Sequence, residues 1–284
     1  MVTPMNESLE VDYAEAGRLA QYLTGHGSDG VVISGTTGES PTLAEQEKIE
    51  LFRAVKKALP EKIVIAGIGS YNTAASVALA KKAAETGVDG LMAVVPYYNK
   101  PQQEGLYKHF KAIAEAVSLP LMLYNIPGRS VVNMLPETVK RLAEIPNIVA
   151  LKESPASMDQ VSELMRVLPS HFAIYSGDDS LTLPMLALGC KGVVSVAAHI
   201  IGDEMRDMVD AWYAGDTTRA AKLHLELFPV FRGIFVTSSP VPVKTLLNMD
   251  GQNVGGVRLP LVSATETEIQ FLRSMMEEVK KKRR

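Results

Sequence analysis

The chain has 284 residues, and its 29 lysines and arginines against 32 aspartates and glutamates give a formal net charge of −3. This balance argues against a nucleic-acid partner, because nucleic-acid-binding domains usually carry a strongly basic face. Hydrophobic residues make up 46% of the chain and charged residues 21%, which predicts a packed core rather than a disordered chain. No apolar run approaches the roughly 18 residues that span a bilayer, no signal-peptide pattern begins the chain, and the single Cys190 cannot form an intrachain disulfide. We therefore expect a soluble protein of the reducing cytoplasm without a membrane contact.

Short apolar runs rich in β-branched residues recur at regular intervals and predict strands that are covered on both faces. These runs span residues 30–33, 63–66, 90–95, 121–124, 148–152, 172–176 and 192–196. Between them, segments with helical periodicity span residues 12–24, 43–59, 73–86, 102–117, 136–144, 158–168 and 181–188. The alternation of strand and helix predicts parallel strands. An eighth strand at residues 1–3 would complete a (β/α)8 barrel, the TIM-barrel fold.

The pattern changes after residue 196, where only helices are predicted, at residues 203–214, 216–235, 241–249 and 265–281. We therefore expect an α/β protein with a (β/α)8 barrel over residues 1–202 and a C-terminal helical region over residues 203–284 that packs on the barrel. Capping patterns agree with the predicted helix ends. They are capping boxes at residues 42–45 and 157–160, Pro136 in a first turn, and Gly87 and Gly189 just past helix ends.

Polar segments follow most of the predicted strands. In a parallel barrel the carboxyl ends of the strands and the loops after them form the active-site face, so polar residues there are the first candidates for function. Such segments span residues 34–39, 96–99, 124–129, 152–154 and 176–179, together with Ser195. We expect them to converge on one rim.

Lys152 ends an apolar strand and should project into the mouth of the barrel. Desolvation at that place disfavours the ammonium form and lowers its pKa, which would produce an amine able to form a Schiff base with a carbonyl. From the strand position alone, a salt bridge with Glu153 or Asp178 is an equal alternative. Neighbouring residues of a strand point to opposite faces, so we expect Glu153 to face outward or to brace a loop.

Hydroxyl groups and anion-binding groups lie at the same strand ends. Tyr124, Thr36 and Thr37 could form a proton relay beside the lysine, although each alone also fits a structural role. Glycine-flanked backbone N–H groups at residues 34–39 could hold a carboxylate. Arg129 offers a planar fork for a second carboxylate, and a structural ion pair is its alternative.

Nucleotide and metal cofactors are not expected. Residues 34–39 lack the Gly-Lys-Ser/Thr ending of a phosphate-binding loop. The five histidines lack metal-ligand spacing, which disfavours a metal-dependent aldolase.

Together these motifs make the chain resemble the 4-hydroxy-tetrahydrodipicolinate synthase (dihydrodipicolinate synthase) family of pyruvate-dependent Schiff-base lyases and aldolases. The resemblance runs from Val2 to the C-terminal region. It is carried by Gly35-Thr36-Thr37-Gly38-Glu39-Ser40, Pro96-Tyr97-Tyr98-Asn99-Lys100-Pro101, Tyr124-Asn125-Ile126-Pro127-Gly128-Arg129, Lys152-Glu153, Ser176-Gly177-Asp178-Asp179 and Pro242-Val243-Lys244.

The resemblance implies roles for four catalytic residues. Lys152 would form the imine with pyruvate, and the derived enamine would attack L-aspartate 4-semialdehyde before cyclisation. Tyr124 matches the family's proton donor and acceptor. Thr36 matches the relay threonine that connects it to Tyr98, which in the family comes from the neighbouring subunit of a tight dimer.

The resemblance also implies substrate-binding residues. Thr37 matches the residue that holds the pyruvate carboxylate, Val194 the position whose backbone carbonyl faces pyruvate, and Arg129 the residue that recognises the semialdehyde carboxylate. The family needs no metal or cofactor beyond the covalent Schiff base on Lys152, and it usually forms a tetramer built from two tight dimers.

Two departures from the family pattern have consequences. The family usually has about ten residues before Val2-Thr3-Pro4 that form most of the first strand, whereas this chain begins at Met1. We hypothesise that Met1 is an internal methionine taken as a start or that the chain is truncated, and we expect a missing strand to leave an open sheet edge. Lysine-inhibited members bind lysine through histidines and a glutamate, and we predict weak or no inhibition because the matching positions are Glu45, Lys48 and Ala75.

Two other functions remain open from the residues alone. An N-acetylneuraminate lyase or a 2-keto-3-deoxy sugar acid aldolase would share the lysine and the tyrosine, so Arg129 and Tyr98 are the discriminating residues. A non-catalytic barrel that only binds a small carboxylic acid or serves as a scaffold is disfavoured by the complete set of Lys152, Tyr124, Thr36 and Thr37.

Overall fold

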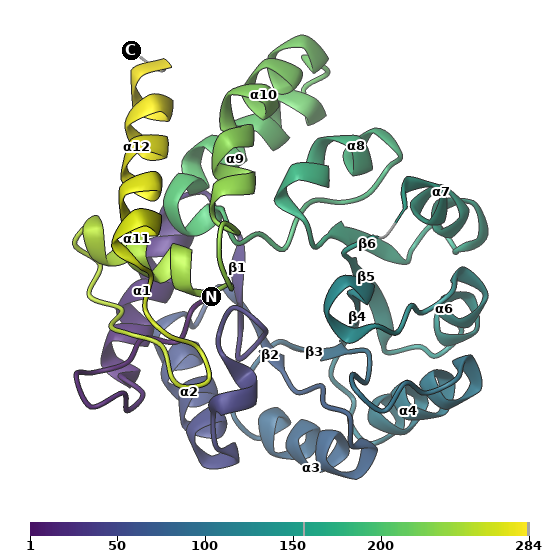
Figure 1. Cartoon of the computed structure of the whole chain (residues 1–284). Coiled ribbons are helices and arrows are strands. Elements are labelled where there is room, and N and C mark those ends of the chain that lie inside the picture. The colour runs from purple at the N-terminus through teal and green to yellow at the C-terminus, as the bar shows by residue number, and fades with distance from the viewer. Residues whose placement is uncertain (156, 283–284) are drawn as a thin grey trace. The chain divides into compact units, whose positions relative to one another are not determined.

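The computed structural model describes residues 1–155 and 157–282 (Figure 1). The chain divides into two compact units, one formed by Met1–Lys62 with Ser195–Arg284 and the other by Ile63–Val194. Each unit is described separately below. No helix within the described ranges is both long and apolar enough to cross a membrane.

The unit Ile63–Val194 is built on a parallel sheet with the strand order β2-β3-β4-β5-β6. The strands are β2 (Ile63–Gly67), β3 (Gly90–Val94), β4 (Leu121–Asn125), β5 (Ile148–Glu153) and β6 (Ala173–Ser176). The helices are α3 (Thr73–Ala84), α4 (Gln103–Glu115), α5 (Pro127–Ser130), α6 (Pro136–Leu142), α7 (Met158–Val167) and α8 (Thr182–Ala187). Within this unit, α3, α4, α6 and α7 line one side of the strands (Figure 1). The unit is therefore an α/β structure with a parallel sheet, as the alternation of strands and helices predicts.

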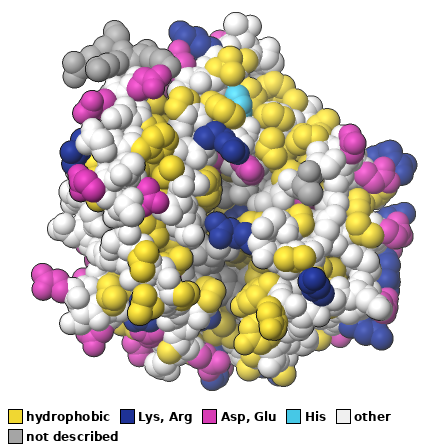
Figure 2. Space-filling view, in the orientation of Figure 1, with side chains coloured by type: hydrophobic (Ala, Val, Ile, Leu, Met, Phe, Trp, Pro, Cys, Tyr) yellow, Lys and Arg dark blue, Asp and Glu magenta, His cyan; other side chains and the backbone are white. Residues whose placement is uncertain are grey.

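The unit of Met1–Lys62 and Ser195–Arg284 is mostly helical. It contains β1 (Gly30–Ile33) and the helices α1 (Tyr13–Gly25), α2 (Glu45–Ala58), α9 (Ala198–Tyr213), α10 (Thr217–Gly233), α11 (Val241–Met249) and α12 (Glu266–Lys282). Helix α1 packs on α2, and α10 packs on both α9 and α12. Helix α10 also exposes Leu225 and Phe228, and hydrophobic side chains reach the surface over α9 and α10 (Figure 2).

Most predicted helices and strands begin and end within three residues of the observed ones, because the apolar periodicity was strong in these segments. Helix α9 is an exception, since it begins at Ala198 rather than at residue 203. Non-helical backbone at Ile201 interrupts it there. The predicted boundary at residue 202, between a barrel and a C-terminal helical region, stays a prediction.

Two predicted strands are absent from the described structure. Residues 1–3 form no strand, although Val2 and Thr3 are buried. Residues 192–196 form only a single parallel bridge, between Val193 and Ser176. The apolar pattern therefore predicted burial correctly at residues 2–3, whereas residues 193–196 are only half-buried. Regular strand pairing followed at neither place.

The two predicted capping boxes are only partly correct. Helix α2 begins at Glu45, so the cap position is Ala44, whose N–H donates to the Glu47 side chain at 2.8 Å. Ser157 does cap α7, because its hydroxyl accepts from the N–H of Asp159 at 3.0 Å. Gln160, the predicted fourth member of that box, instead contacts Asn133.

Candidate active site

Lys152 and Tyr124 lie side by side at the carboxyl ends of adjacent parallel strands. They are register partners in the pairing of β5 with β4. The Lys152 Nζ lies 4.1 Å from the centroid of the Tyr124 ring, and that ring is buried. The face of an aromatic ring attracts a cation, so the ring holds the amine at this place. Within residues 1–155 and 157–282, Lys152 forms no ion pair with Glu153 or Asp178, which removes the structural alternative considered for it.

Gly177 lets the chain approach the lysine closely. A Cβ atom at this position would lie 2.9 Å from Lys152 Cε and would overlap with Ser154 Oγ. The Gly177 N–H donates to the Glu153 carbonyl at 2.7 Å, so the backbone is fixed there. Ser154 Oγ is buried and has no hydrogen-bond partner among the described residues. Any side chain at position 177 would displace the lysine stem.

Glu153 points away from Lys152 into a buried network of amides. Asn125 Nδ2 donates to both Glu153 carboxylate oxygens, at 3.0 and 3.1 Å, and to Asn133 Oδ1 at 2.8 Å. Burial raises the pKa of Glu153 to about 8, against the opposing effect of the hydrogen bonds from Asn125 and Gln160. The network ties β4, β5 and α7 together behind Lys152. Glu153 therefore has the bracing role that was one of its two predicted alternatives.

Tyr98 lies in a loop and Arg129 in a short helix of the same unit, and both side chains are exposed. Tyr98 follows β3, is 92% exposed and has φ of 74°, a left-handed conformation that is uncommon for a tyrosine. Arg129 lies in the short helix α5, which the sequence did not predict. Its guanidinium forms no ion pair with any described residue, so the structural alternative for Arg129 is not observed.

Val194 follows the short parallel pairing beside β6. Its N–H donates to the Ser176 carbonyl at 2.8 Å, and the Ser176 N–H donates to Gly192 at 2.8 Å. The peptide at Val194 is therefore held at the carboxyl end of β6. Within this unit, Lys152 and Tyr124 thus lie at the carboxyl ends of adjacent strands, and Val194 lies beside the end of β6.

Thr36 and Thr37 belong to the other unit and form the turn after β1. The Glu39 N–H donates to the Thr36 carbonyl at 3.1 Å, and the Gly38 N–H donates to Gly35 at 3.1 Å. The two threonines are half-buried, and no hydrogen bond of the described residues uses their hydroxyl groups. The hydroxyls of this turn are available to a ligand.

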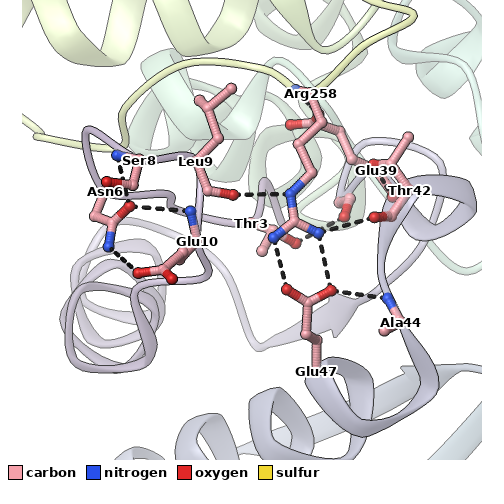
Figure 3. Close-up of polar contacts among 11 residues, drawn as sticks. Thr3, Asn6, Ser8, Leu9, Glu10, Glu39, Thr42, Ala44, Glu47 and Arg258 are labelled. Atoms are coloured by element: carbon pink, nitrogen blue, oxygen red, sulfur yellow. Dashed lines mark hydrogen bonds and ion pairs between the residues drawn. The ribbon is translucent and has the colours of Figure 1, made fainter.

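Glu39, at the end of this turn, is held by two cationic residues that are distant in the sequence. Its side chain is 1% exposed, and its Oε1 lies 2.8 Å from the Lys244 Nζ of α11. The Lys244 amine is off the hydrogen-bonding direction of that oxygen, so the contact is ionic. The Arg258 N–H donates to Glu39 Oε2 at 3.0 Å, and the Arg258 guanidinium binds both oxygens of Glu47 (Figure 3). The family motifs contain Glu39 and Lys244, but the sequence analysis assigned no role to either residue. No local sequence pattern indicated a role for Arg258.

No group of three or more His, Cys, Asp or Glu side chains in the described ranges could hold a metal ion. His199 illustrates a structural role. Its Nδ1 lies 2.8 Å from the Val196 carbonyl, and its Nε2 accepts from the Val2 N–H at 3.0 Å. Burial lowers the pKa of His199 to about 3, so the ring is neutral at physiological pH.

The comparison with known proteins decides the family. The sequence model of the Dihydrodipicolinate synthetase family matches residues 1–279. The chain belongs to this family. A 4-hydroxy-tetrahydrodipicolinate synthase of Desulforamulus reducens is 60% identical over 97% of this chain and 94% of its own length.

Solved structures of family members agree with this assignment. Dihydrodipicolinate synthase of Bacillus anthracis superposes with a TM-score of 0.96 at 51% identity, covering 98% of this chain and 95% of its own. The enzyme of Cyanidioschyzon merolae, solved with lysine bound, gives a TM-score of 0.97 at 46% identity and covers 99% and 96% of the two chains. The predicted family resemblance is confirmed.

Proposed function

We propose that this chain is a lyase that condenses pyruvate with L-aspartate 4-semialdehyde and gives 4-hydroxy-tetrahydrodipicolinate, in diaminopimelate and lysine biosynthesis. The function rests on family membership and on relatives named 4-hydroxy-tetrahydrodipicolinate synthase at 60% and 56% identity over nearly the whole chain. The observation that carries it in this chain is the Lys152 amine held over the Tyr124 ring at the carboxyl ends of β5 and β4. No other amine in the quoted motifs has that position on the sheet.

Lys152 is the proposed nucleophile. Its neutral amine attacks the C2 carbonyl of pyruvate, and the carbonyl oxygen takes up a proton to give a carbinolamine. Loss of water then leaves the imine, with Tyr124 as the group that moves protons at the reacting atoms. The imine draws electrons from C3, so that a C3 proton leaves and an enamine forms. The proposed chemistry therefore needs no metal or organic cofactor.

The second substrate reacts at the enamine. C3 attacks the aldehyde carbon of the semialdehyde, and the aldehyde oxygen becomes a hydroxyl by taking up a proton. The substrate's own amino group then attacks the imine carbon, which closes the ring and releases the Lys152 amine. Arg129 is the proposed ligand of the semialdehyde carboxylate, and its unpaired guanidinium has the fork geometry for this role.

The remaining residues are assigned by the same family pattern. We assign Thr37 to the pyruvate carboxylate, the Val194 carbonyl to bound pyruvate, and Thr36 to the proton relay. Tyr98 is the last member of that relay and is proposed to act from a neighbouring subunit of a tight dimer, which agrees with its 92% exposure. We propose a tetramer made from two such dimers, on a (β/α)8 barrel with a C-terminal helical region.

Reduction of the imine tests this proposal. Wild-type chain is incubated with pyruvate and sodium borohydride, its intact mass is measured, and the modified peptide is mapped. Lys152→Arg is the matched control, because it keeps the charge and lacks a nucleophilic amine. A pyruvate adduct on Lys152, together with turnover of L-aspartate 4-semialdehyde in a coupled assay, supports the proposed function. An adduct without that turnover would assign the chain to a related aldolase, and no adduct would indicate a non-catalytic barrel.

A further inference from the structure

The ion pair of Glu39 and Lys244 is a buried feature that the proposed chemistry does not use. The two side chains are 1% and 3% exposed and come from the turn after β1 and from α11. Burial lowers the pKa of Lys244, while the carboxylate of Glu39 opposes this effect. Such a pair is costly to bury, and apolar residues of similar volume often give equal or greater stability. Stability alone therefore does not account for it.

The location of Glu39 suggests what the pair does. Glu39 follows Thr36, Thr37 and Gly38 directly, and its backbone has φ of 55° and ψ of 35°, a left-handed conformation. That conformation costs free energy for a residue other than glycine and persists only where contacts hold it. The carboxylate supplies such contacts, to the Lys244 amine on one oxygen and to the Arg258 N–H on the other.

Backbone hydrogen bonds and two further side chains also hold the turn. The Gly38 N–H donates to the Gly35 carbonyl and the Glu39 N–H to the Thr36 carbonyl, both at 3.1 Å. Thr3 Oγ1 donates to the Gly38 carbonyl at 2.7 Å. The Arg258 guanidinium donates to the Thr42 carbonyl at 2.8 Å (Figure 3). The side chains of Thr36 and Thr37 have no described partner. Their orientation therefore depends on the backbone of the turn, which the Glu39 side chain fixes at its end.

We propose that the buried Glu39–Lys244 pair is a positioning element that fixes the Thr36–Thr37 turn in the conformation that binds the pyruvate carboxylate. This inference rests on the proposed function, because that function gives the two threonines their role. Lys244 and Glu39 touch no substrate in this proposal. They act through the turn.

Three variants and a control separate positioning from stability. Lys244→Met removes the charge at similar length, Glu39→Gln keeps an oxygen for the Arg258 N–H, and the double variant leaves no unpaired charge. Arg219→Gln is the control, since it removes an exposed cation that lies 3.8 Å from Asp207 in the same unit. Each chain is measured for its melting temperature, for the second-order rate of borohydride trapping by pyruvate, and for hydrogen exchange of residues 34–40.

The double variant is expected to melt within about 4 °C of the wild type, because no charge is left buried alone and only the hydrogen bond from Lys244 Nζ to the Gly256 carbonyl is lost. Its trapping rate should still fall by about tenfold to a hundredfold, the cost of a small misplacement of binding groups. Exchange of the turn amides should rise by about tenfold, since local opening becomes easier. The control should match the wild type in all three measurements. Recovery of the trapping rate and of exchange protection in the double variant would reduce the pair to a structural role.

A coupling measurement tests whether the pair acts through the turn. In a Thr37→Ala background, Lys244→Met should change the pyruvate KM by less than about twofold, because the group that it positions is already absent. Fully additive effects would overturn the proposal. A wild-type chain that is not trapped by pyruvate would refute the proposed function instead. The exchange of residues 34–40 in the double variant would then still decide whether the pair holds the turn.

Discussion

Glu153 offers the clearest test of how burial of a titrating group affects the stability of this protein. Its carboxyl group is fully buried and receives hydrogen bonds from the amides of Asn125 and Gln160, without a cation beside it. Burial raises its pKa from 4.5 to about 8. The substitution Glu153→Gln replaces the titrating group with a neutral side chain of the same shape, so it should remove this contribution to the pH dependence of stability.

The sign follows from proton binding. Between pH 4.5 and about pH 8 the folded chain keeps a proton on Glu153 that the unfolded chain has lost. The free energy of unfolding therefore contains a contribution that is fully present below pH 4.5 and is lost as the pH rises through 8. At 1.36 kcal/mol for each pKa unit, the whole contribution is roughly 5 kcal/mol.

Urea unfolding at a fixed protein concentration measures this effect at pH 5 and at pH 9. The difference in free energy of unfolding between Glu153→Gln and the wild type should shift by about 3 to 5 kcal/mol in favour of the variant as the pH rises from 5 to 9. Glu144→Gln is the control, because Glu144 is exposed, and its difference from the wild type should stay flat. A difference for Glu153→Gln that changes by less than about 1 kcal/mol would refute the argument. A change of opposite sign would mean that the amides hold an ionised carboxylate.

Arg129→Ala should raise the KM for L-aspartate 4-semialdehyde by about tenfold to a hundredfold and leave pyruvate trapping unchanged. Equal losses in semialdehyde turnover and in pyruvate trapping would contradict the assignment of Arg129 to the semialdehyde carboxylate. Gly177→Ala places a methyl group 2.9 Å from Lys152 Cε, so trapping should slow by about tenfold or more, and wild-type trapping would show that the lysine stem is not confined. Mixed oligomers of Lys152→Ala and Tyr98→Phe chains should recover up to about a quarter of wild-type activity. No recovery would place Tyr98 outside a shared site. Low-millimolar lysine should inhibit turnover weakly or not at all in the coupled assay, and clear inhibition would contradict the prediction made from Glu45, Lys48 and Ala75.

The proposed chemistry was predictable because it lies at strand ends. Apolar runs located β4 and β5, and the polar residue at each end was then Tyr124 or Lys152. Parallel register brings the carboxyl ends of neighbouring strands together, which predicts that these two residues lie close. In the structure the Lys152 Nζ lies 4.1 Å from the centroid of the Tyr124 ring. Their expected placement needed no information on how side chains pack.

The supporting residues were harder to predict, because they act across long stretches of sequence. Asn133 lies in a loop without periodicity, yet it joins the amide network of Glu153 through Asn125. Arg258 binds Glu47 and the backbone N–H of Arg258 binds Glu39, although no local pattern marks it. The two predicted strands that the described structure lacks, at residues 1–3 and 192–196, were wrong for a related reason, since an apolar run does not show which backbone partner is available.

Two buried carboxylates stand next to proposed active-site residues, and the same substitution should affect them in opposite ways. Glu153 has only neutral amides around it, so Glu153→Gln removes a charge that burial disfavours and should stabilise the chain at high pH. Glu39 faces the Lys244 amine, so Glu39→Gln leaves a buried cation without its counter-charge and should lower stability at neutral pH by about 3 kcal/mol. Urea unfolding of Glu153→Gln at pH 9 and of Glu39→Gln at pH 7, each against the wild type at the same pH, measures the two signs. Equal signs would mean that burial alone, and not the partner of each carboxylate, decides the free energy.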